Sequence, residues 1–319
     1  MLLSSAKNFV QTSVQKGAGI YLLLVFSLIV FALFAPAMIA PKHLLELTVH
    51  ATSLGIVAMG QTIVMLAGMF DLSVGAIMTL INVIGAGTFS EVENSITPIV
   101  LMLLGLGALV GFVNGIGITK LKIPPFMMTL GMWLALRGVV LVYTKGGPKG
   151  HWPAPIQYLA KGWIWGVFPI STLLWLVLTA AGIYVLHRTA WGRYIYATGG
   201  NPRTTFLSGI KANNVIILSF TLCGFLSALA GIMLSGYVGL GSFQVGGEEY
   251  LLNSIAAAVL GGTTFSGGVG GLSGTLGGAY LLTLIDSGLT MIGVGYPGRL
   301  IFTGTVIIVF TGIYEKLTG

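Results

Sequence analysis

Residues 45–75, LELTVHATSLGIVAMGQTIVMLAGMFDLSVG, decide the fold of this chain. Their first part is an apolar run long enough to cross a lipid bilayer, which takes about 20 residues, and the run breaks at Gly68. A second apolar run begins almost at once, after Asp71. Backbone groups released at such a break are tolerated at membrane depth only where they are buried against protein or line a cavity. The stretch therefore predicts a membrane protein with a discontinuous helix.

The composition of the whole chain points the same way. The chain has 319 residues, of which 55% are hydrophobic and 7% charged, whereas about a quarter of the residues of a soluble domain are charged. The mean hydropathy is +0.96, which excludes a water-soluble globule. The net charge of +7 indicates membrane topology and not nucleic-acid binding. Cys223 is the single cysteine, so neither an intrachain disulfide nor a thiolate metal site can form.

Apolar runs of spanning length recur along the chain, separated by basic residues and by Gly-Pro or Asn-Pro punctuation. We therefore predict an all-α, polytopic integral membrane protein of about ten transmembrane helices, some broken at Gly-rich segments, forming a single domain over residues 1–319. The ten predicted spans are residues 19–40, 45–68, 72–90, 96–119, 123–143, 163–186, 213–238, 250–267, 271–293 and 297–314.

Basic residues near the ends of these spans predict the orientation. A cytoplasmic amino terminus places nine Lys and Arg residues inside and five outside, which is the sign that the positive-inside rule expects. An even number of spans then returns the carboxy terminus to the cytoplasm. The first run exceeds the apolar core of a secretory signal, about 7 to 15 residues, so we expect an uncleaved helix. The inside set is Lys7, Lys16, Lys120, Lys122, Arg188, Arg193, Arg203, Lys211 and Lys316, and the outside set is Lys42, Lys145, Lys149, Lys161 and Arg299.

Glycines mark two predicted helix breaks. Asp71 follows the first break, where we expect its carboxylate to accept amides of the next helix as an N-cap, with direct solute contact as the alternative. The second break is residues 261–271, GGTTFSGGVGG. No GxxxxGK[ST] sequence occurs in the chain, so these glycines do not form a Walker A phosphate loop. The glycines assigned to the two breaks are Gly68, Gly75, Gly261, Gly262, Gly267 and Gly268.

No group of side chains in the sequence predicts catalysis or metal binding. The four histidines, at positions 43, 50, 151 and 187, are dispersed over different spans and loops. Glu46 and Arg137 lie near the ends of predicted spans, where we expect them to reach the interface as anchors. Residues 111–115 contain a GxxxG pattern that predicts close helix packing, and Asn114 within it either bridges helices or meets a hydroxylated solute. Two broken helices fit a transporter more closely than an enzyme.

Five segments together resemble a known family. The segments are residues 65–75, 111–115, 123–131, 192–201 and 255–271, and the likeness extends over roughly residues 50–315. In this order they resemble the membrane permease subunits of ribose-type monosaccharide ABC transporters, which are binding-protein-dependent sugar importers.

The resemblance implies a transporter built from several subunits with different functions. Two permease subunits, identical or paralogous, would enclose the path through the bacterial inner membrane, and a periplasmic or extracellular sugar-binding protein would deliver the solute. Two cytoplasmic ATPase subunits would bind ATP and magnesium, so this chain would hold no cofactor. The resemblance places the ATPase contact in the cytoplasmic loop of residues 187–212, at Arg193, Asn201, Pro202, Arg203 and Gly209.

For the solute path we predict residues with an aromatic face or a hydrogen-bonding group, because a neutral polyol would use both. They are Gln61, Phe70, Asp71, Asn114, Phe126 and Thr129.

Other solutes and another source of energy stay open. Nucleosides, branched-chain amino acids and a sugar-like signalling molecule are alternative solutes, although a zwitterion should require paired charges in the path. An ion-coupled secondary transporter is the alternative mechanism, with Asp71 or Asp286 as the coupling carboxylate.

Overall fold

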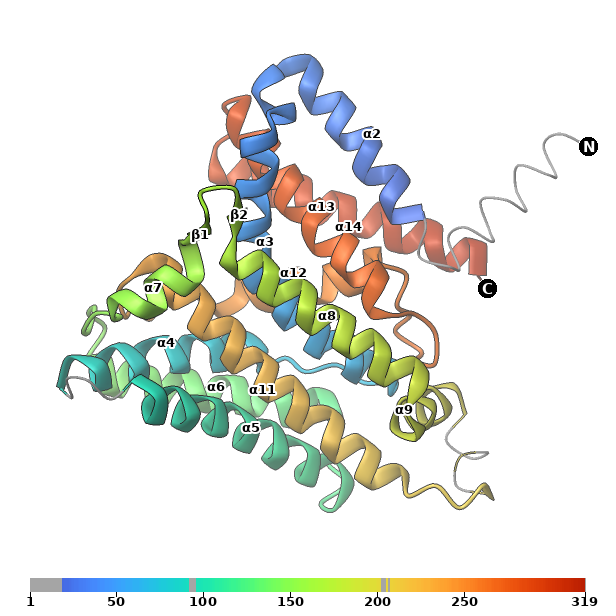
Figure 1. The fold of residues 1–319 in the computed structure, drawn as a ribbon. Helices are drawn as coiled ribbons and strands as arrows, with labels where there is room; N and C mark the ends of the chain where they lie inside the picture. The colour runs from blue at the N-terminus through green and yellow to red at the C-terminus, as the bar shows by residue number, and fades with distance from the viewer. Residues whose placement is uncertain (1–18, 92–95, 202–204, 206, 319) are drawn as a thin grey trace, which may run out of the picture.

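The structure, a computed structural model, describes residues 19–91, 96–201, 205 and 207–318. Apart from one two-stranded hairpin, its regular elements are helices (Figure 1). In chain order they are α2 (Gly19–Phe34), the 3-10 helix η1 (Pro36–Ile39), α3 (Pro41–Leu66), α4 (Val74–Glu91), α5 (Ile96–Thr119), α6 (Pro125–Thr144), α7 (Ala154–Lys161), β1 (Trp163–Ile164), β2 (Phe168–Pro169), α8 (Ile170–Arg188), α9 (Ala190–Gly200), α11 (Ala212–Val238), α12 (Gly247–Leu260), α13 (Leu272–Met291) and α14 (Tyr296–Thr318).

The prediction of an all-α membrane protein is confirmed, but the count of about ten spans is not. Among the described residues, six helices are long and apolar enough to cross a membrane, namely α3, α4, α5, α6, α8 and α11. Each of the other four predicted spans contains a helix. However, α2 has 16 residues and α12 has 14, and neither α13 nor α14 belongs to the six.

Two predicted boundaries are wrong for local reasons. The span predicted at 163–186 begins later, because β1 and β2 first pair antiparallel, with Trp163 opposite Pro169. The span predicted at 250–267 ends at Leu260, because glycines follow it and Gly262 adopts a φ of +90°, in the left-handed region.

Helix α3 forms the centre of the molecule. All of its residues from Ala51 to Leu66 are buried, and it contacts α8, α9, α11, α12 and α13. By contrast, only 17% of the most apolar 18-residue stretch of α6 is buried within the chain. A helix buried on all sides must pair its polar side chains internally, and the Thr62 hydroxyl does so with the Thr275 hydroxyl of α13 at 2.7 Å.

Helices α5 and α11 lie side by side along their lengths (Figure 1). A Cβ added at Gly107 or Gly111 of α5 would overlap the backbone carbonyl of Gly224 or Phe220 of α11, and one at Gly115 would lie 2.7 Å from the Cα of Ile217. The absence of side chains on this face therefore sets the separation of the two helices, as the GxxxG pattern predicts.

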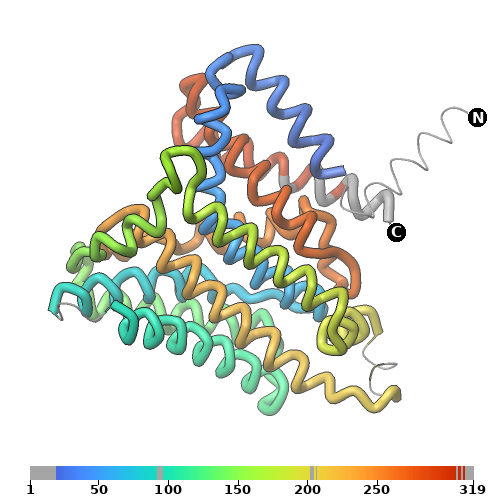
Figure 2. The backbone as a smooth tube through the Cα atoms, in the orientation of Figure 1, coloured from blue at the N-terminus to red at the C-terminus, as the bar shows by residue number. Residues whose placement is uncertain are grey.

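The two ends of the helices carry different structures. Helix α7 and the β1–β2 hairpin precede the start of α8, and α9 follows its end, so the hairpin and α9 lie at opposite ends of α8 (Figure 1). Helices α2, α13 and α14 gather on one flank of the molecule (Figure 2).

The close contact of α5 with α11 generates a stability prediction. Replacing Gly224 with Ala should lower the melting temperature in detergent, because the new methyl group overlaps the carbonyl oxygen of Gly107 and overpacking costs about 1–3 kcal/mol. The matched control is Gly105→Ala, since a Cβ there meets no atom within 4 Å. It should be neutral or slightly stabilising, because Ala is a better helix former than Gly. Equal melting temperatures for the two variants would contradict the described helix contact.

Candidate functional site

The first helix break is held closed by a buried amide. Helix α3 ends at Leu66 and α4 begins at Val74. The amides of residues 67–69 donate to carbonyls of the last turn of α3, but the backbone at Asp71 needs another partner. The side chain of Gln61, which is fully buried, supplies that partner. With the amide oriented so that both of its groups find partners, its nitrogen donates to the Asp71 carbonyl oxygen at 3.1 Å and its oxygen accepts from the Asp71 N–H at 3.2 Å. Both polar atoms of the Gln61 side chain therefore bind the backbone of the break itself.

Asp71 and Asn114 extend this network. Asp71 Oδ1 accepts from the Ser73 N–H at 2.8 Å and from the Ser73 hydroxyl at 2.6 Å. Asn114 Nδ2 of α5 donates to Ser73 Oγ at 3.0 Å, and the Ser73 carbonyl accepts the first helical bond, from the Ile77 N–H. Asp71 thus holds the turn that leads into α4, but the N-cap position belongs to Ser73, two residues later, and not to Asp71 as we predicted. Asn114 connects α5 to this turn.

The other predicted path residues lie on or near α6. The rings of Phe70 and Phe126 meet edge to face with centroids 6.5 Å apart, and Phe126 is 46% exposed. Thr129 is fully buried and its hydroxyl donates to the Pro125 carbonyl of its own helix at 2.9 Å. Of the six predicted path residues, Phe126 is therefore the one that offers an exposed surface, while Gln61, Asp71, Asn114 and Thr129 are buried.

The second break follows α12 and is built on turns. The amides of Gly261, Gly262 and Thr263 fold back onto carbonyls of the last turn of α12 at 2.8 to 3.0 Å. Gly262, Gly267 and Gly268 have φ values of +90°, +83° and +71°, which residues with a Cβ adopt only under strain. The chain can therefore leave α12 and reverse before α13 begins.

Gly75 does not lie at a break. It is the second residue of α4, where a Cβ would overlap the carbonyl oxygen of Gly247 in α12. The assignment of Gly75 to the break is wrong because α4 has already begun at Val74. The residue instead lets the start of α12 lie directly against the start of α4.

The two breaks meet each other and the end of α9 (Figure 2). The Gly268 N–H donates to the Leu66 carbonyl at 2.9 Å. A Cβ on Gly267 would lie 2.6 Å from the Cα of Gly68, and one on Gly268 would lie 2.7 Å from the Cα of Gly200. A Cβ on Gly199 would overlap the Leu66 carbonyl oxygen. We call this contact of Gly68, Gly199, Gly200, Gly267 and Gly268 the glycine joint.

Helix α9 is also tied to the second break by a side chain. The Tyr196 hydroxyl donates to the Gly270 carbonyl at 2.9 Å. Burial raises the pKa of the Tyr196 phenol, so it keeps its proton at neutral pH and remains a donor. At the start of α9, the Thr189 hydroxyl accepts from the Gly192 N–H at 3.3 Å and caps the helix.

The predicted ATPase contact is described only in part. Arg193 is exposed on α9, and the Asn201 carbonyl accepts from the Thr205 N–H at 3.0 Å, an i to i+4 bond typical of a helix. Gly209 has a φ of +73°, which suits the turn after such a helix. Pro202 and Arg203 lie outside the described residues.

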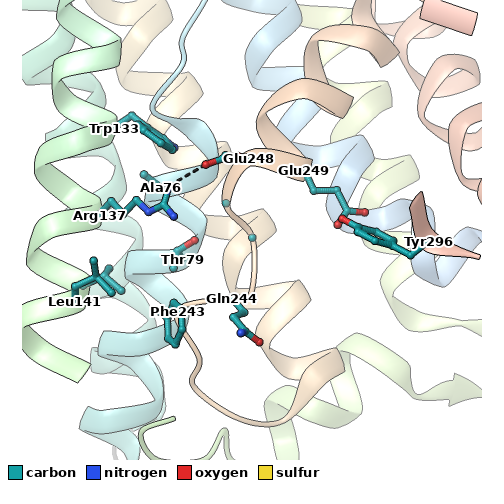
Figure 3. A pocket seen from close by; sticks show the side chains of 13 residues that line it. Ala76, Thr79, Trp133, Arg137, Leu141, Phe243, Gln244, Glu248, Glu249 and Tyr296 are labelled. Carbon is teal, nitrogen blue, oxygen red and sulfur yellow. Dashed lines mark hydrogen bonds and ion pairs between the residues drawn. The ribbon is translucent and has the colours of Figure 1, made fainter. Parts of the chain in front are cut away.

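A charged surface on α6, α12 and α14 was not predicted. Arg137 NH1 of α6 lies 2.8 Å from Glu248 Oε1 at the start of α12 (Figure 3). Arg137 therefore has an acidic partner on another helix, which the prediction of an interfacial anchor did not include. Arg299 of α14 donates to both oxygens of Asp286 at 2.8 and 2.7 Å. The partners of the first pair are 111 residues apart, so no local pattern could reveal it.

The comparisons with known proteins agree with one another. A protein-family model described as "Branched-chain amino acid transport system / permease component" matches residues 43–311. The ribose import permease protein RbsC of Escherichia coli (strain K12) is 37% identical over 270 residues, which cover 82% of each chain. RbsC of Bacillus subtilis (strain 168) is 36% identical over 84% of this chain and 83% of its own. The fructose import permease protein FrcC of Rhizobium meliloti is 35% identical over 81% and 74%. No solved structure matches the chain.

The network at the first break generates a prediction that separates its structural role from an ion-coupling role. Asp71→Ala should lower the free energy of unfolding by about 1–3 kcal/mol, because the Ser73 N–H and hydroxyl lose their buried acceptor. Asp71→Asn keeps one acceptor oxygen and should melt close to the parent protein in detergent.

Transport distinguishes the two roles further. Asp71→Asn should preserve transport if the side chain only holds the turn. Complete loss of transport in a stable Asp71→Asn protein would instead favour a carboxylate that must carry charge.

Proposed function

Because the chain belongs to the family of branched-chain amino acid transport system permease components, we propose that it is the permease subunit of an ATP-driven, binding-protein-dependent importer of a monosaccharide. The observation that carries the proposal is the 37% identity to a ribose import permease over 82% of both chains. The similar fructose import permease supports a sugar but does not select one. The subunit would pass the solute through the membrane without modifying it.

The proposed topology is that of a single permease domain of ten spans in a bacterial inner membrane. The helices α2, α12, α13 and α14 would complete the six long apolar helices, since each occupies a predicted span. Both termini would be cytoplasmic, which places α9 and the loop of residues 187–212 inside and the β1–β2 hairpin outside. The positive-inside balance supports this orientation.

The glycine joint supports a mechanical role for the cytoplasmic loop. In this proposal an ATPase subunit, which binds ATP and magnesium, contacts the loop of residues 187–212. The contact residues are Arg193, Asn201, Pro202, Arg203 and Gly209. Helix α9 ends against both helix breaks with no side chain between the backbones, so a displacement of α9 reaches α3, α4, α12 and α13 together. A second permease subunit would close the path on the side of α6, α12 and α14.

The path itself would carry aromatic and polar side chains. Phe126 and its neighbour Phe70 would form its apolar edge, whereas Gln61, Asp71, Asn114 and Thr129 would hold the backbone that shapes it. Ion coupling is less well supported, because Asp71 holds a turn and Asp286 is paired with Arg299.

A branched-chain amino acid is the second candidate solute. The description of the family model that matches residues 43–311 names this class of solute. Its test is competition: an excess of leucine or valine should not inhibit sugar uptake if the sugar is the solute.

Reconstitution tests the proposed function directly. The chain should be co-expressed with the ATPase and binding-protein genes that neighbour its own, purified as a complex, and placed in liposomes. With the binding protein outside and ATP at the ATPase face, uptake of labelled ribose or fructose should require all components and magnesium. The control is an ATPase variant that binds but does not hydrolyse ATP, and it should abolish uptake.

Two outcomes would contradict this function. Sugar uptake by the purified chain alone, without an ATPase subunit, would remove the separate motor. Uptake that persists without ATP and collapses with the proton gradient would establish ion coupling.

A further inference from the structure

The Arg137–Glu248 pair lies on a surface that the rest of this chain leaves open. Arg137 lies within the span predicted at 123–143 and Glu248 two residues before the span predicted at 250–267, and their side chains are 55% and 63% exposed within this chain. A charge at the bilayer centre costs several kcal/mol, so such residues face a protein interior or a water-filled cavity. The surface that carries the pair must therefore border a solvated space or another subunit.

A pocket opens at this pair. It has a volume of about 340 Å³ and lies between α4, α6, the amino end of α12 and Tyr296 of α14 (Figure 3). This volume is near the lower limit of ligand pockets, about 300–1,000 Å³, and so fits a small solute. Several of its lining side chains can stack on a ligand or hydrogen-bond with it, among them Trp133, Arg137, Phe243, Gln244, Glu248 and Tyr296.

The chemistry of the lining suits hydroxyl groups. The Arg137 guanidinium lies 5.1 Å from the centroid of the Trp133 ring, which fixes the charged group beside an aromatic face. A guanidinium supplies several donors and a carboxylate several acceptors, and their hydrogen bonds to neutral groups are stronger than those between neutral partners. The positive guanidinium and the negative carboxylate together match a solute whose groups both donate and accept hydrogen bonds, as the hydroxyls of a polyol do.

The position of Glu248 is set by backbone contacts and not by a flexible loop. Gly246 and Gly247 have φ values of +91° and +69°, and they bring the chain into the first turn of α12. The close approach of the Gly247 carbonyl to Gly75 anchors that turn on α4. In Figure 3, Glu248 points toward Arg137 on one side, whereas Glu249 points the opposite way, toward Tyr296.

We propose that this pocket is a solute-binding site inside the translocation path, in which Arg137 and Glu248 hydrogen-bond the hydroxyls of a neutral monosaccharide while Trp133 contacts its apolar face. The proposal rests on the proposed function and deepens it. When the site is empty, the two charged groups satisfy each other at 2.8 Å. A solute hydroxyl that accepts from Arg137 and donates to Glu248 replaces this bond, so the gain on binding is small and release is easy.

The test uses the complete importer in liposomes, with ribose or fructose as the probe. Glu248→Gln should lower uptake about tenfold or more, the loss expected for a hydrogen bond to a charged group. The matched control is Glu46→Gln, because Glu46 forms an exposed pair with Lys42 at 3.9 Å that does not line the pocket. It should leave uptake unchanged.

Two further variants separate solute contact from a structural bond between helices. The exchange Arg137→Glu with Glu248→Arg restores opposite charges, so full recovery of uptake would show a structural bond and overturn the proposal. Trp133→Leu breaks no ion pair and should raise the apparent KM severalfold. If the Glu248→Gln subunit does not assemble into the importer, the KM of the Trp133→Leu importer still tests the proposal.

Monodeoxy sugars identify the contact itself. A sugar lacking the hydroxyl that meets Glu248 should be taken up equally by the parent complex and by Glu248→Gln, whereas the complete sugar should distinguish them. If the parent complex imports no sugar, the proposed function fails. If it imports sugar and Glu248→Gln and Trp133→Leu match it for every probe, the binding site fails while the importer stands.

Discussion

The fold depends on one constraint: buried backbone N–H and C=O groups that leave a helix need partners within the protein. Two such departures, after α3 and after α12, meet at the glycine joint. The first break is satisfied by turns onto the end of α3 and by the Gln61 amide, which pairs with both backbone groups of Asp71 when its nitrogen faces the Asp71 carbonyl. The second is satisfied by turns and by the first break, since the Gly268 N–H donates to the Leu66 carbonyl. Each break therefore helps to stabilise the other.

The contact between the two breaks also brings them against the end of α9. Glycines let the two breaks approach at backbone distance, and the same absence of side chains admits the end of α9. Helix α9 is thus joined at one place to both breaks, the one between α3 and α4 and the one between α12 and α13. The charged surface of α6 and α12 lies apart from that joint, so the proposed coupling region and the proposed path are separate sites connected by whole helices.

Sequence reasoning succeeded where the signal is local. The apolar runs, the two Gly-rich breaks and the close packing at residues 111–115 all follow from spacing and composition, and the family resemblance is confirmed. It was less successful with polar residues inside apolar runs. Gln61, Asn114 and Thr129 were assigned to the path, yet each is fully buried and bonded to the protein. An amide that lines a path and one that holds a backbone look alike in sequence, and the distant Arg137–Glu248 pair has no local signature.

The central claim is that α9 acts on both breaks through the glycine joint. The most direct test is the number of sugar molecules imported per ATP hydrolysed by the reconstituted complex. In Gly199→Ala the new methyl group overlaps the Leu66 carbonyl oxygen, whereas a Cβ on the adjacent Gly200 lies 4.0 Å from its nearest neighbour, the Cα of Gly268. We expect Gly199→Ala to hydrolyse ATP but import severalfold less sugar per ATP, and Gly200→Ala to keep the parent ratio. Identical ratios for the two variants and the parent would contradict the claim.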